Sequence, residues 1–258
     1  MRFVQSWSFF MKQYNRLLVN GCSFVAGGHL GDFGENYGNT HFLMSLQDKL
    51  NCKYKSDFWS NKSYNIAKAG KSNDYICRTM TYWLFNNQDK IKDTLFIIGL
   101  TELSRIEYYD VVGTRYRTYY PEVENDDYWK RLFSSSLTGE EGLKFIEKLY
   151  KYTFDNTIRA NELYLQLSLI QDYICHRGGE LVLFSSLCTE FNHKEKFNYF
   201  EFQNHDTWND WAIDKSGGNT RPDKISMDQY LSPTAHPGPK ANKELSNMLY
   251  NYIKNGFK

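Results

Sequence analysis

The stretch that decides the fold is Leu17-Leu18-Val19-Asn20-Gly21-Cys22-Ser23-Phe24. It begins with apolar and strand-forming residues and stops at Gly21, which predicts a buried strand followed by an abrupt turn. Ser23 then lies just past the carboxyl end of that strand. Because open α/β sheets bind their ligands at the carboxyl ends of the strands, Ser23 is a candidate nucleophile. Most Gly-x-Ser turns have no catalytic role, so other segments must decide between the two interpretations.

Strands and helices alternate along the rest of the chain. Short apolar runs predict further strands over residues 64–67, 94–100 and 180–186. Apolar residues at helical spacing predict helices over residues 41–50, 74–86, 140–176 and 239–254, the third of them open to a break near 155–156. This alternation predicts an α/β fold with a mostly parallel, doubly wound sheet. We expect one domain over residues 1–258, with residues 1–16 as an N-terminal extension and Met11 as an alternative start.

Two segments lack clear periodicity and are interpreted as insertions, at about residues 104–139 and 187–230. The first is rich in Tyr and Arg. An irregular segment of this length inside a compact domain is often a lid or a binding insertion. The other interpretation, a solvated surface excursion, stays equally open.

The charge balance argues against polyanionic partners. The chain carries 31 Lys and Arg against 30 Asp and Glu, for a net charge of +1. It therefore lacks the basic excess typical of proteins that bind nucleic acid or an anionic membrane. Its five cysteines form no C-x-x-C pair, which favours a reducing compartment over a disulfide framework or a zinc site. Without a signal peptide or an 18-residue apolar run, we expect a cytoplasmic protein.

Several polar residues follow the predicted strands. Ser23, Gly70 and Thr101 come after three successive strands, and His236 precedes the last helix. Because parallel strands end at one edge of a sheet, these residues can meet there. Ester hydrolysis at a serine needs a hydroxyl, a base beside it, and donors for the developing oxyanion. The four positions together can supply all three.

Four segments carry a resemblance to a known family. Residues 21–24, 65–70, 99–102 and 234–237 resemble, in order and spacing, the four blocks of the SGNH (GDSL-type) hydrolases. The resemblance implies a flavodoxin-like three-layer α/β/α fold and ester or acyl hydrolysis without a metal or cofactor. A small-molecule or carbohydrate ester would be the substrate. Residues 70–73 and 101–105 also look like divergent phage-encoded members of the group, which would allow a location in a virion.

The same resemblance implies roles for individual residues. Ser23 would be the nucleophile and His236 the general base. The oxyanion would be bound by the backbone N–H groups of Ser23 and Gly70 and by the side chain of Thr101. Supporting positions in the matching segments are Asn73, Glu102, Arg105 and Thr234.

The chain departs from the family pattern at three places. Cys22 stands where the first block has Asp, and Thr101 stands where the third block has Asn. The Asp that normally precedes the histidine by two or three residues is missing. We therefore expect a Ser–His dyad or an incomplete triad, with His236 oriented by a backbone carbonyl or by one of the nearest carboxylates, namely Asp206, Asp210, Asp223 and Asp228. Cys22 is a weaker candidate nucleophile, because adjacent side chains in an extended turn point opposite ways.

Two other functions stay open. The three departures suit a binding or structural protein that keeps the fold and has lost catalysis. The glycine-rich residues 26–34 would suit a nucleotide-binding module, although neither a G-x-x-x-x-G-K-[ST] nor a G-x-G-x-x-G motif follows the strand. The aromatic content of 17% would suit stacking on sugars or bases, or simply half-buried tyrosines.

Overall fold

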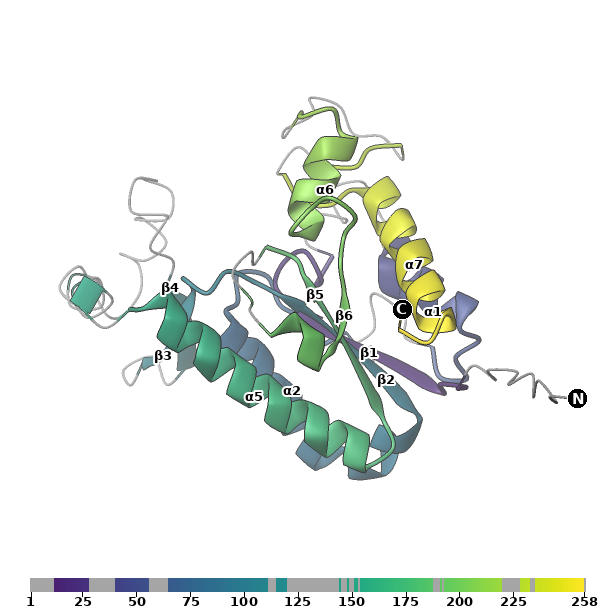
Figure 1. Cartoon of the computed structure of the whole chain (residues 1–258), viewed down its shortest axis with the longest axis horizontal. Helices are drawn as coiled ribbons and strands as arrows, with labels where there is room; N and C mark the ends of the chain where they lie inside the picture. The colour runs from purple at the N-terminus through teal and green to yellow at the C-terminus, as the bar shows by residue number, and fades with distance from the viewer. Residues whose placement is uncertain are drawn as a thin grey trace, which may run out of the picture.

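The sheet at the centre of the protein is parallel throughout. A computed structural model describes residues 12–27, 40–55, 65–110, 115–119, 144, 148, 151–152, 154–187, 191, 193–219, 228–232 and 235–257. Its main sheet has the order β1 (Arg16–Gly21), β2 (Thr94–Leu100), β5 (Glu180–Ser185) and β6 (Asn198–Phe200) (Figure 1). A parallel bridge from Asn65 to Val19 adds one more segment beside β1. With that segment counted as the second strand, the order is 2-1-3-4-5, as in flavodoxin-like sheets.

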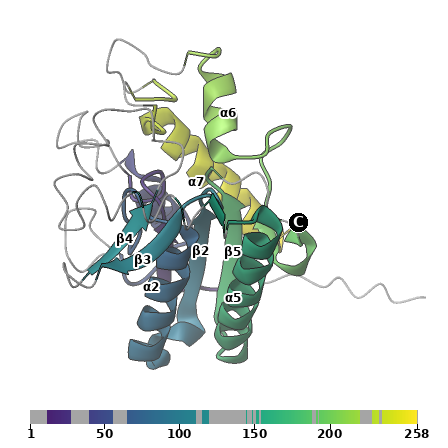
Figure 2. The ribbon, with the colours of Figure 1, turned by 90° about the vertical axis from the view of Figure 1, so that its left-hand side faces the viewer.

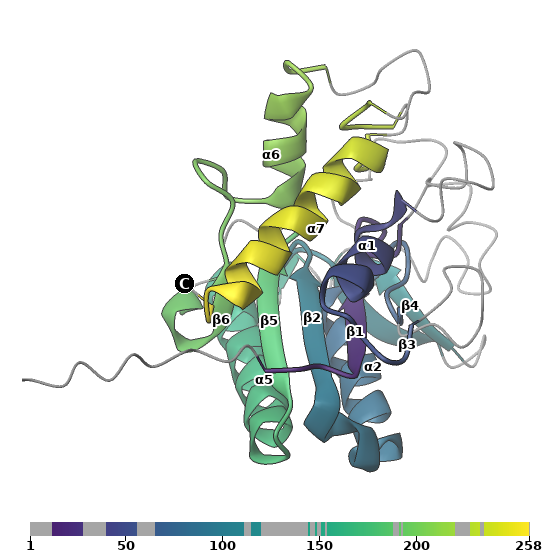
Figure 3. The same ribbon diagram turned by 90° about the vertical axis from the view of Figure 1, so that its right-hand side faces the viewer.

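Helices cover both faces of this sheet (Figure 3). The first face carries α1 (Phe42–Lys49) and α7 (Pro239–Lys254), and the second carries α2 (Asn73–Asn86) and α5 (Asn156–His176). Side chains along each strand alternate between the two cores: in β1, Leu17 and Val19 face α1 and α7, whereas Leu18 faces α2 and α5. Burial on both faces explains why the strands are almost continuously apolar. The predicted three-layer α/β architecture is confirmed.

Several boundaries agree closely with the sequence. The strand expected over residues 94–100 and the helix expected over residues 239–254 have those bounds in the structure. The hydroxyl of Ser72 accepts a hydrogen bond from the N–H of Tyr75 and caps α2. The carboxylate of Asp155 caps α5 in the same way, at the break expected in the long helical segment. In the described part of the chain, no helix combines the length and apolar content needed to cross a bilayer.

The two irregular segments contain more structure than we predicted. Residues 106–110 and 115–119 form an antiparallel strand pair, β3 (Ile106–Asp110) and β4 (Arg115–Tyr119), seen beside α2 in Figure 2. Its strands mix charged and aromatic residues, so no apolar face marked them. The segment after β5 holds a 3₁₀ turn, η5 (Lys194–Lys196), then β6 and α6 (Trp208–Lys215). These elements are too short for a clear hydrophobic periodicity in the sequence. In the structure, α6 packs against the core through Trp208, which is fully buried.

Two strand boundaries also need correction. The predicted strand at residues 64–67 is reduced to the bridge at Asn65, and residue 64 lies outside the described residues. At the N-terminus, β1 begins at Arg16, and Tyr14 is 2% exposed and donates a hydrogen bond to Glu180. Residues 14–16, assigned to an extension, therefore belong to the packed fold. Another 3₁₀ helix, η3 (Gln88–Asp93), leads from α2 into β2.

Candidate active site

Ser23 and His236 meet at the carboxyl edge of the sheet although 213 residues separate them. The Oγ atom of Ser23 lies 3.0 Å from Nε2 of His236, and both side chains are partly buried. This is the distance that a general base needs to take the serine proton. Sequence reasoning proposed both residues, and the structure brings them together.

The position of Ser23 follows from the topology. The chain leaves β1 through the turn at residues 22–27, where the N–H of Ala26 donates to the carbonyl of Cys22. It then enters α1 on one face of the sheet, whereas α2, which leads to β2, covers the opposite face (Figure 3). The strand order reverses between β1 and β2, and ligands of open α/β sheets bind at such a switch point.

Val25 anchors the serine turn in a space left by two glycines. A Cβ atom built on Gly21 would lie 2.5 Å from Cγ2 of Val25, and one built on Gly99 would lie 2.4 Å from the same atom. Side chains at either glycine would therefore collide with Val25. Because Gly21 and Gly99 have no side chains, the turn can fold back onto the ends of β1 and β2. This packing fixes the height of Ser23 above the sheet.

His41 holds the same turn from the side. Its Nε2 lies 2.8 Å from the carbonyl oxygen of Val25, and its Nδ1 accepts the N–H of Leu43 at 3.2 Å. The side chain is completely buried, and this burial lowers the pKa of His41 to about 4. Sequence reasoning did not select His41. The only available signal was its place directly before the predicted helix, where a capping residue is expected.

The loop that carries His236 is braced by its own backbone. Ser232 donates its N–H to the carbonyl of His236 at 2.7 Å, and the Ser232 hydroxyl accepts the N–H of His236 at 3.1 Å. Ala235 adopts a φ of +60°, which turns the chain sharply just before the histidine. The ring of Phe24 packs against the imidazole, with 5.1 Å between the ring centroids. The histidine is thus held from the loop and from the serine turn.

Gly70 reaches the same edge through the segment beside β1. The N–H of Lys68 donates to the carbonyl of Gly21 at 3.1 Å, so the chain passes next to the end of β1 just before Gly70. Gly70 has a φ of +68°, a conformation that favours glycine, and is half-buried. Gly70 therefore lies two residues after a hydrogen bond to the end of β1.

The backbone groups of Thr101 are hydrogen-bonded to Asn73, another of the predicted site residues. Its N–H donates to Oδ1 of Asn73 at 3.0 Å, and its carbonyl accepts a hydrogen bond from Nδ2 of Asn73 at 2.8 Å. The Thr101 side chain is fully buried and faces the thiol of Cys22. The pair of bonds ties the start of α2 to the end of β2. The structure therefore brings Asn73 and Thr101 to each other and leaves the Thr101 hydroxyl in the interior.

Cys22 lies behind the serine, next to a pair of opposite charges. It is fully buried, and this burial raises the pKa of its thiol, an effect that the nearby Arg105 guanidinium partly opposes. Arg105 forms an ion pair with Glu102, three residues earlier in the chain. Because a thiol with a raised pKa is protonated and a buried one is inaccessible, Cys22 does not compete with Ser23 as a nucleophile.

The described candidate carboxylates have the following surroundings. Asp210 accepts a hydrogen bond from the Thr207 hydroxyl at 2.7 Å, and Asp206 is exposed. Asp228 lines a separate cavity of about 510 Å³. Thr234 and Asp223 lie outside the described residues. Among the residues that are described, no group of three or more His, Cys, Asp or Glu side chains is arranged to hold a metal ion.

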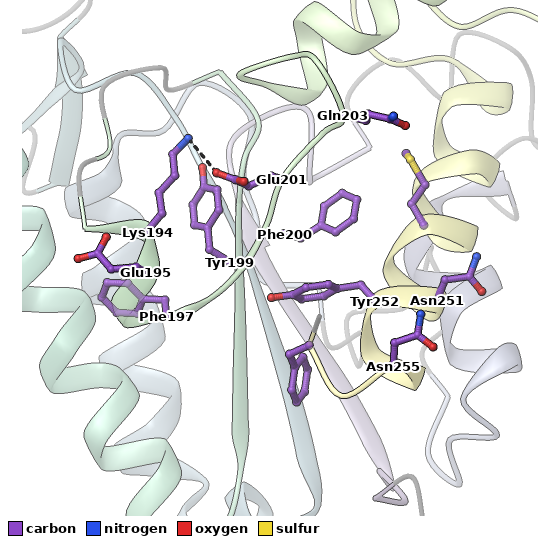
Figure 4. Close-up of a pocket in the computed structure, with 12 residues that line it drawn as sticks. Lys194, Glu195, Phe197, Tyr199, Phe200, Glu201, Gln203, Asn251, Tyr252 and Asn255 are labelled. Atoms are coloured by element: carbon purple, nitrogen blue, oxygen red, sulfur yellow. Dashed lines mark ion pairs between the residues drawn. The ribbon is translucent and has the colours of Figure 1, made fainter. Parts of the chain in front are cut away.

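A larger cavity lies beside β6, the last strand in the sheet order. It measures about 870 Å³ and is bounded by η5 and β6 on one side and the end of α7 on the other (Figure 4). Phe200 and Tyr252, which both line it, are in edge contact, with 5.5 Å between ring centroids and 68° between the ring planes. Neither this cavity nor the smaller one is lined by Ser23 or His236. These two cavities are therefore separate from the Ser23–His236 pair.

Comparisons with known proteins give distant structural likenesses. No family model matches the sequence, and no curated protein matches it. The crystal structure of TesA is similar to this chain with a TM-score of 0.43 and 13% identity, covering 93% of this chain and 98% of TesA. The psychrotrophic esterase EstA from Pseudoalteromonas sp., inhibited by monoethylphosphonate, gives a TM-score of 0.43 and 13% identity, covering 94% of this chain and 98% of EstA. None of these comparisons tests the likeness to phage-encoded members.

Proposed function

We propose that the protein is a serine ester hydrolase in which Ser23 is the nucleophile and His236 the general base. The observation that carries the proposal is the 3.0 Å separation of Ser23 Oγ and His236 Nε2 at the carboxyl edge of a parallel sheet. In the reaction, Nε2 takes the hydroxyl proton while Oγ attacks the ester carbonyl. The protonated His236 then gives the proton to the leaving alcohol. In the second step, His236 takes a proton from water, the water oxygen attacks the acyl-enzyme, and the proton returns to Ser23 as the acid is released.

The negative charge on the carbonyl oxygen needs donors. We assign the backbone N–H groups of Ser23 and Gly70 to this role, because both belong to turns at the same sheet edge. Thr101 is left out of the assignment, since its N–H is bonded to Asn73 and its hydroxyl is buried. Loss of one oxyanion donor typically costs about 10²–10³ in rate, so we expect a slow esterase.

The substrate is proposed at the level of its chemistry. A small-molecule or carbohydrate ester fits a dyad that needs no metal or cofactor. The aromatic residues 108–129 belong to the first irregular segment and would form a wall of the substrate site in this proposal, but their side chains lie largely outside the described residues. We therefore propose the ester class and leave the alcohol group to experiment.

The test is turnover of p-nitrophenyl acetate together with labelling by a fluorophosphonate probe. The wild-type protein should do both, and Ser23→Ala and His236→Ala should do neither while keeping the wild-type melting temperature. Matched controls are Ser168→Ala on α5 and His176→Ala in its last turn, since both lie on the opposite face of the sheet. Labelling that persists in Ser23→Ala would overturn the proposal.

A second candidate is a protein of the same fold that binds an ester without hydrolysing it. It is favoured by one observation, the mutual hydrogen bonds of Asn73 and Thr101, which remove two potential oxyanion donors from the site. This candidate predicts neither labelling of Ser23 nor turnover. It also predicts that Ser23→Ala leaves the affinity for a bound ester unchanged.

A further inference from the structure

The start of α1 contacts both segments of the dyad through two consecutive residues. The first contact is from His41 to the serine turn. The N–H of Leu43 donates to Nδ1 of His41, so this nitrogen carries no proton. The proton of the neutral ring is then on Nε2, which donates to the Val25 carbonyl at 2.8 Å. Val25 lies two residues after Ser23, inside the same turn.

The second contact runs from the neighbouring residue to the histidine loop. The N–H of Phe42 donates to Oδ1 of Asn242 at 3.2 Å. The amide nitrogen of Asn242 donates in turn to the carbonyls of Pro237 and Gly238, at 3.1 and 3.0 Å. Pro237 directly follows His236. All three bonds of this buried side chain agree with one orientation of its amide group.

We propose that His41 and Asn242 are positioning residues, which clamp the Ser23 turn and the His236 loop to the N-terminus of α1 and so set the distance between nucleophile and base. This inference rests on the proposed hydrolase function. Neither residue touches the reacting atoms. Both act through the backbone carbonyls next to them, at Val25 and Pro237.

The clamp is needed because, among the described residues, no strand pairing joins the Ser23 turn to the His236 loop. Ser23 follows β1, whereas His236 precedes α7, and the two elements belong to different layers. A displacement of about 1 Å between reacting groups can cost about 10²-fold in rate. The start of α1 holds the Val25 carbonyl through the side chain of His41 and is linked to the Pro237 carbonyl through the side chain of Asn242. Both side chains are buried, and their hydrogen bonds resist such a displacement.

Two substitutions of His41 separate the clamp from a plain helix cap. In His41→Asn, the amide oxygen can replace Nδ1 and keep the cap of α1, but the side chain is too short to reach Val25. In His41→Gln, the amide nitrogen can replace Nε2 and keep the bond to Val25, whereas the cap is weakened. The clamp predicts that kcat for p-nitrophenyl acetate falls about tenfold or more in His41→Asn and stays within about threefold in His41→Gln, with KM unchanged in both.

Asn242 is tested in the same assay. Asn242→Asp keeps the acceptor for Phe42 and loses both donors to the histidine loop, so kcat should fall about tenfold. Asn247→Asp, an exposed position on α7, is the matched control and should have wild-type kcat. A purely structural role predicts instead that kcat follows the melting temperature, with His41→Gln the more damaged His41 variant. That order would overturn the proposal.

The ring tautomer gives a readout that does not depend on catalysis. Nitrogen NMR of the folded wild-type protein should find His41 neutral at pH 7, with its proton on Nε2. A proton on Nδ1 would overturn the clamp whether or not the protein hydrolyses esters. An inactive and unlabelled wild type would instead overturn the proposed function. Active wild type with an equally active His41→Asn would overturn the clamp alone.

Discussion

The imidazole of His236 and the phenyl ring of Phe24 pack together, with 5.1 Å between ring centroids and 40° between their planes. Phe24 is the residue after the candidate nucleophile, so the serine turn itself supports the base. Aromatic pairs of this kind contribute about 0.5–1.5 kcal/mol beyond their buried area. We expect Phe24→Ala to lower kcat for p-nitrophenyl acetate up to about tenfold, and Phe24→Leu to lower it less. Equal kcat in Phe24→Ala and the wild type would show that the ring contact does not orient His236.

The close approach of Val25 predicts the effect of a side chain at Gly99. In Gly99→Ala the new Cβ would lie 2.4 Å from Cγ2 of Val25 and 2.5 Å from Oγ of Ser186. Overpacking of this kind typically costs about 1–3 kcal/mol of folding free energy. Urea unfolding should detect this loss, and displacement of the serine turn should slow probe labelling.

A double mutant tests whether Val25 is the cause. Val25→Ala removes the atom that collides with the new methyl group, so Gly99→Ala should cost less stability in the Val25→Ala background than in the wild type. Additive losses would mean that Ser186 or Phe184, the other neighbours of that Cβ position, dominates the collision.

The Asn73–Thr101 pair predicts a stability loss. Asn73→Ala removes both hydrogen bonds and leaves the N–H of Thr101 without that acceptor in the core. A net loss of about 1–3 kcal/mol is expected in urea unfolding, since each bond contributes about 1 kcal/mol and a buried orphan group costs more. Asn73→Asp keeps the acceptor and places a negative charge in the first turn of α2, so its loss should be smaller.

The depressed pKa of His41 predicts how stability depends on pH. The folded protein keeps this ring neutral down to a pKa of about 4, whereas the unfolded chain protonates it near 6.5. Between these values the unfolded state binds more protons, so stability falls as the pH is lowered from about 6.5 to about 4. The full contribution of this group is about 3 kcal/mol. The measurement is the free energy of unfolding at pH 7, 5 and 4 in wild type and His41→Asn.

The comparison of the two proteins isolates the histidine. Carboxylates that titrate in the same range are common to both, so their effect cancels in the difference. The gap in stability between wild type and His41→Asn should shrink as the pH falls, because only the wild type loses the His41 contribution. A gap that stays constant would mean that His41 keeps an ordinary pKa in the folded state.

The layered fold could be predicted from the sequence because its main elements satisfy simple patterns. The apolar run of residues 94–100 is long enough for a strand buried on both faces, and residues 239–254 keep helical spacing over four turns. The sequence patterns did not predict the strand pair β3–β4 or the strand β6, for different reasons. The sequences of β3 and β4 mix charged and aromatic residues without an apolar alternation, and β6 is held by its pairing with β5 rather than marked by its own three residues.

The site was predictable where it depended on chemistry at strand ends. Ser23 was proposed because it follows a predicted strand, and His236 because it stands just before the last predicted helix and matches a block of the family resemblance. The structure places Ser23 Oγ and His236 Nε2 3.0 Å apart. The engagement of Thr101 by Asn73 could not be foreseen, since it depends on the depth at which α2 packs against β2. His41 and Asn242 escaped notice for the same reason. Their bonds join segments that are far apart in the sequence.

The order of the elements along the chain has a consequence for biosynthesis. The ribosome releases the serine turn first and the histidine loop 213 residues later, immediately ahead of α7. Until α7 is made, the apolar side of the sheet that it covers has no complete partner layer, and the hydroxyl has no base. Under the proposed function, folding of the final layer and acquisition of reactivity coincide, so a nascent or truncated chain without this last segment would be chemically inert at Ser23.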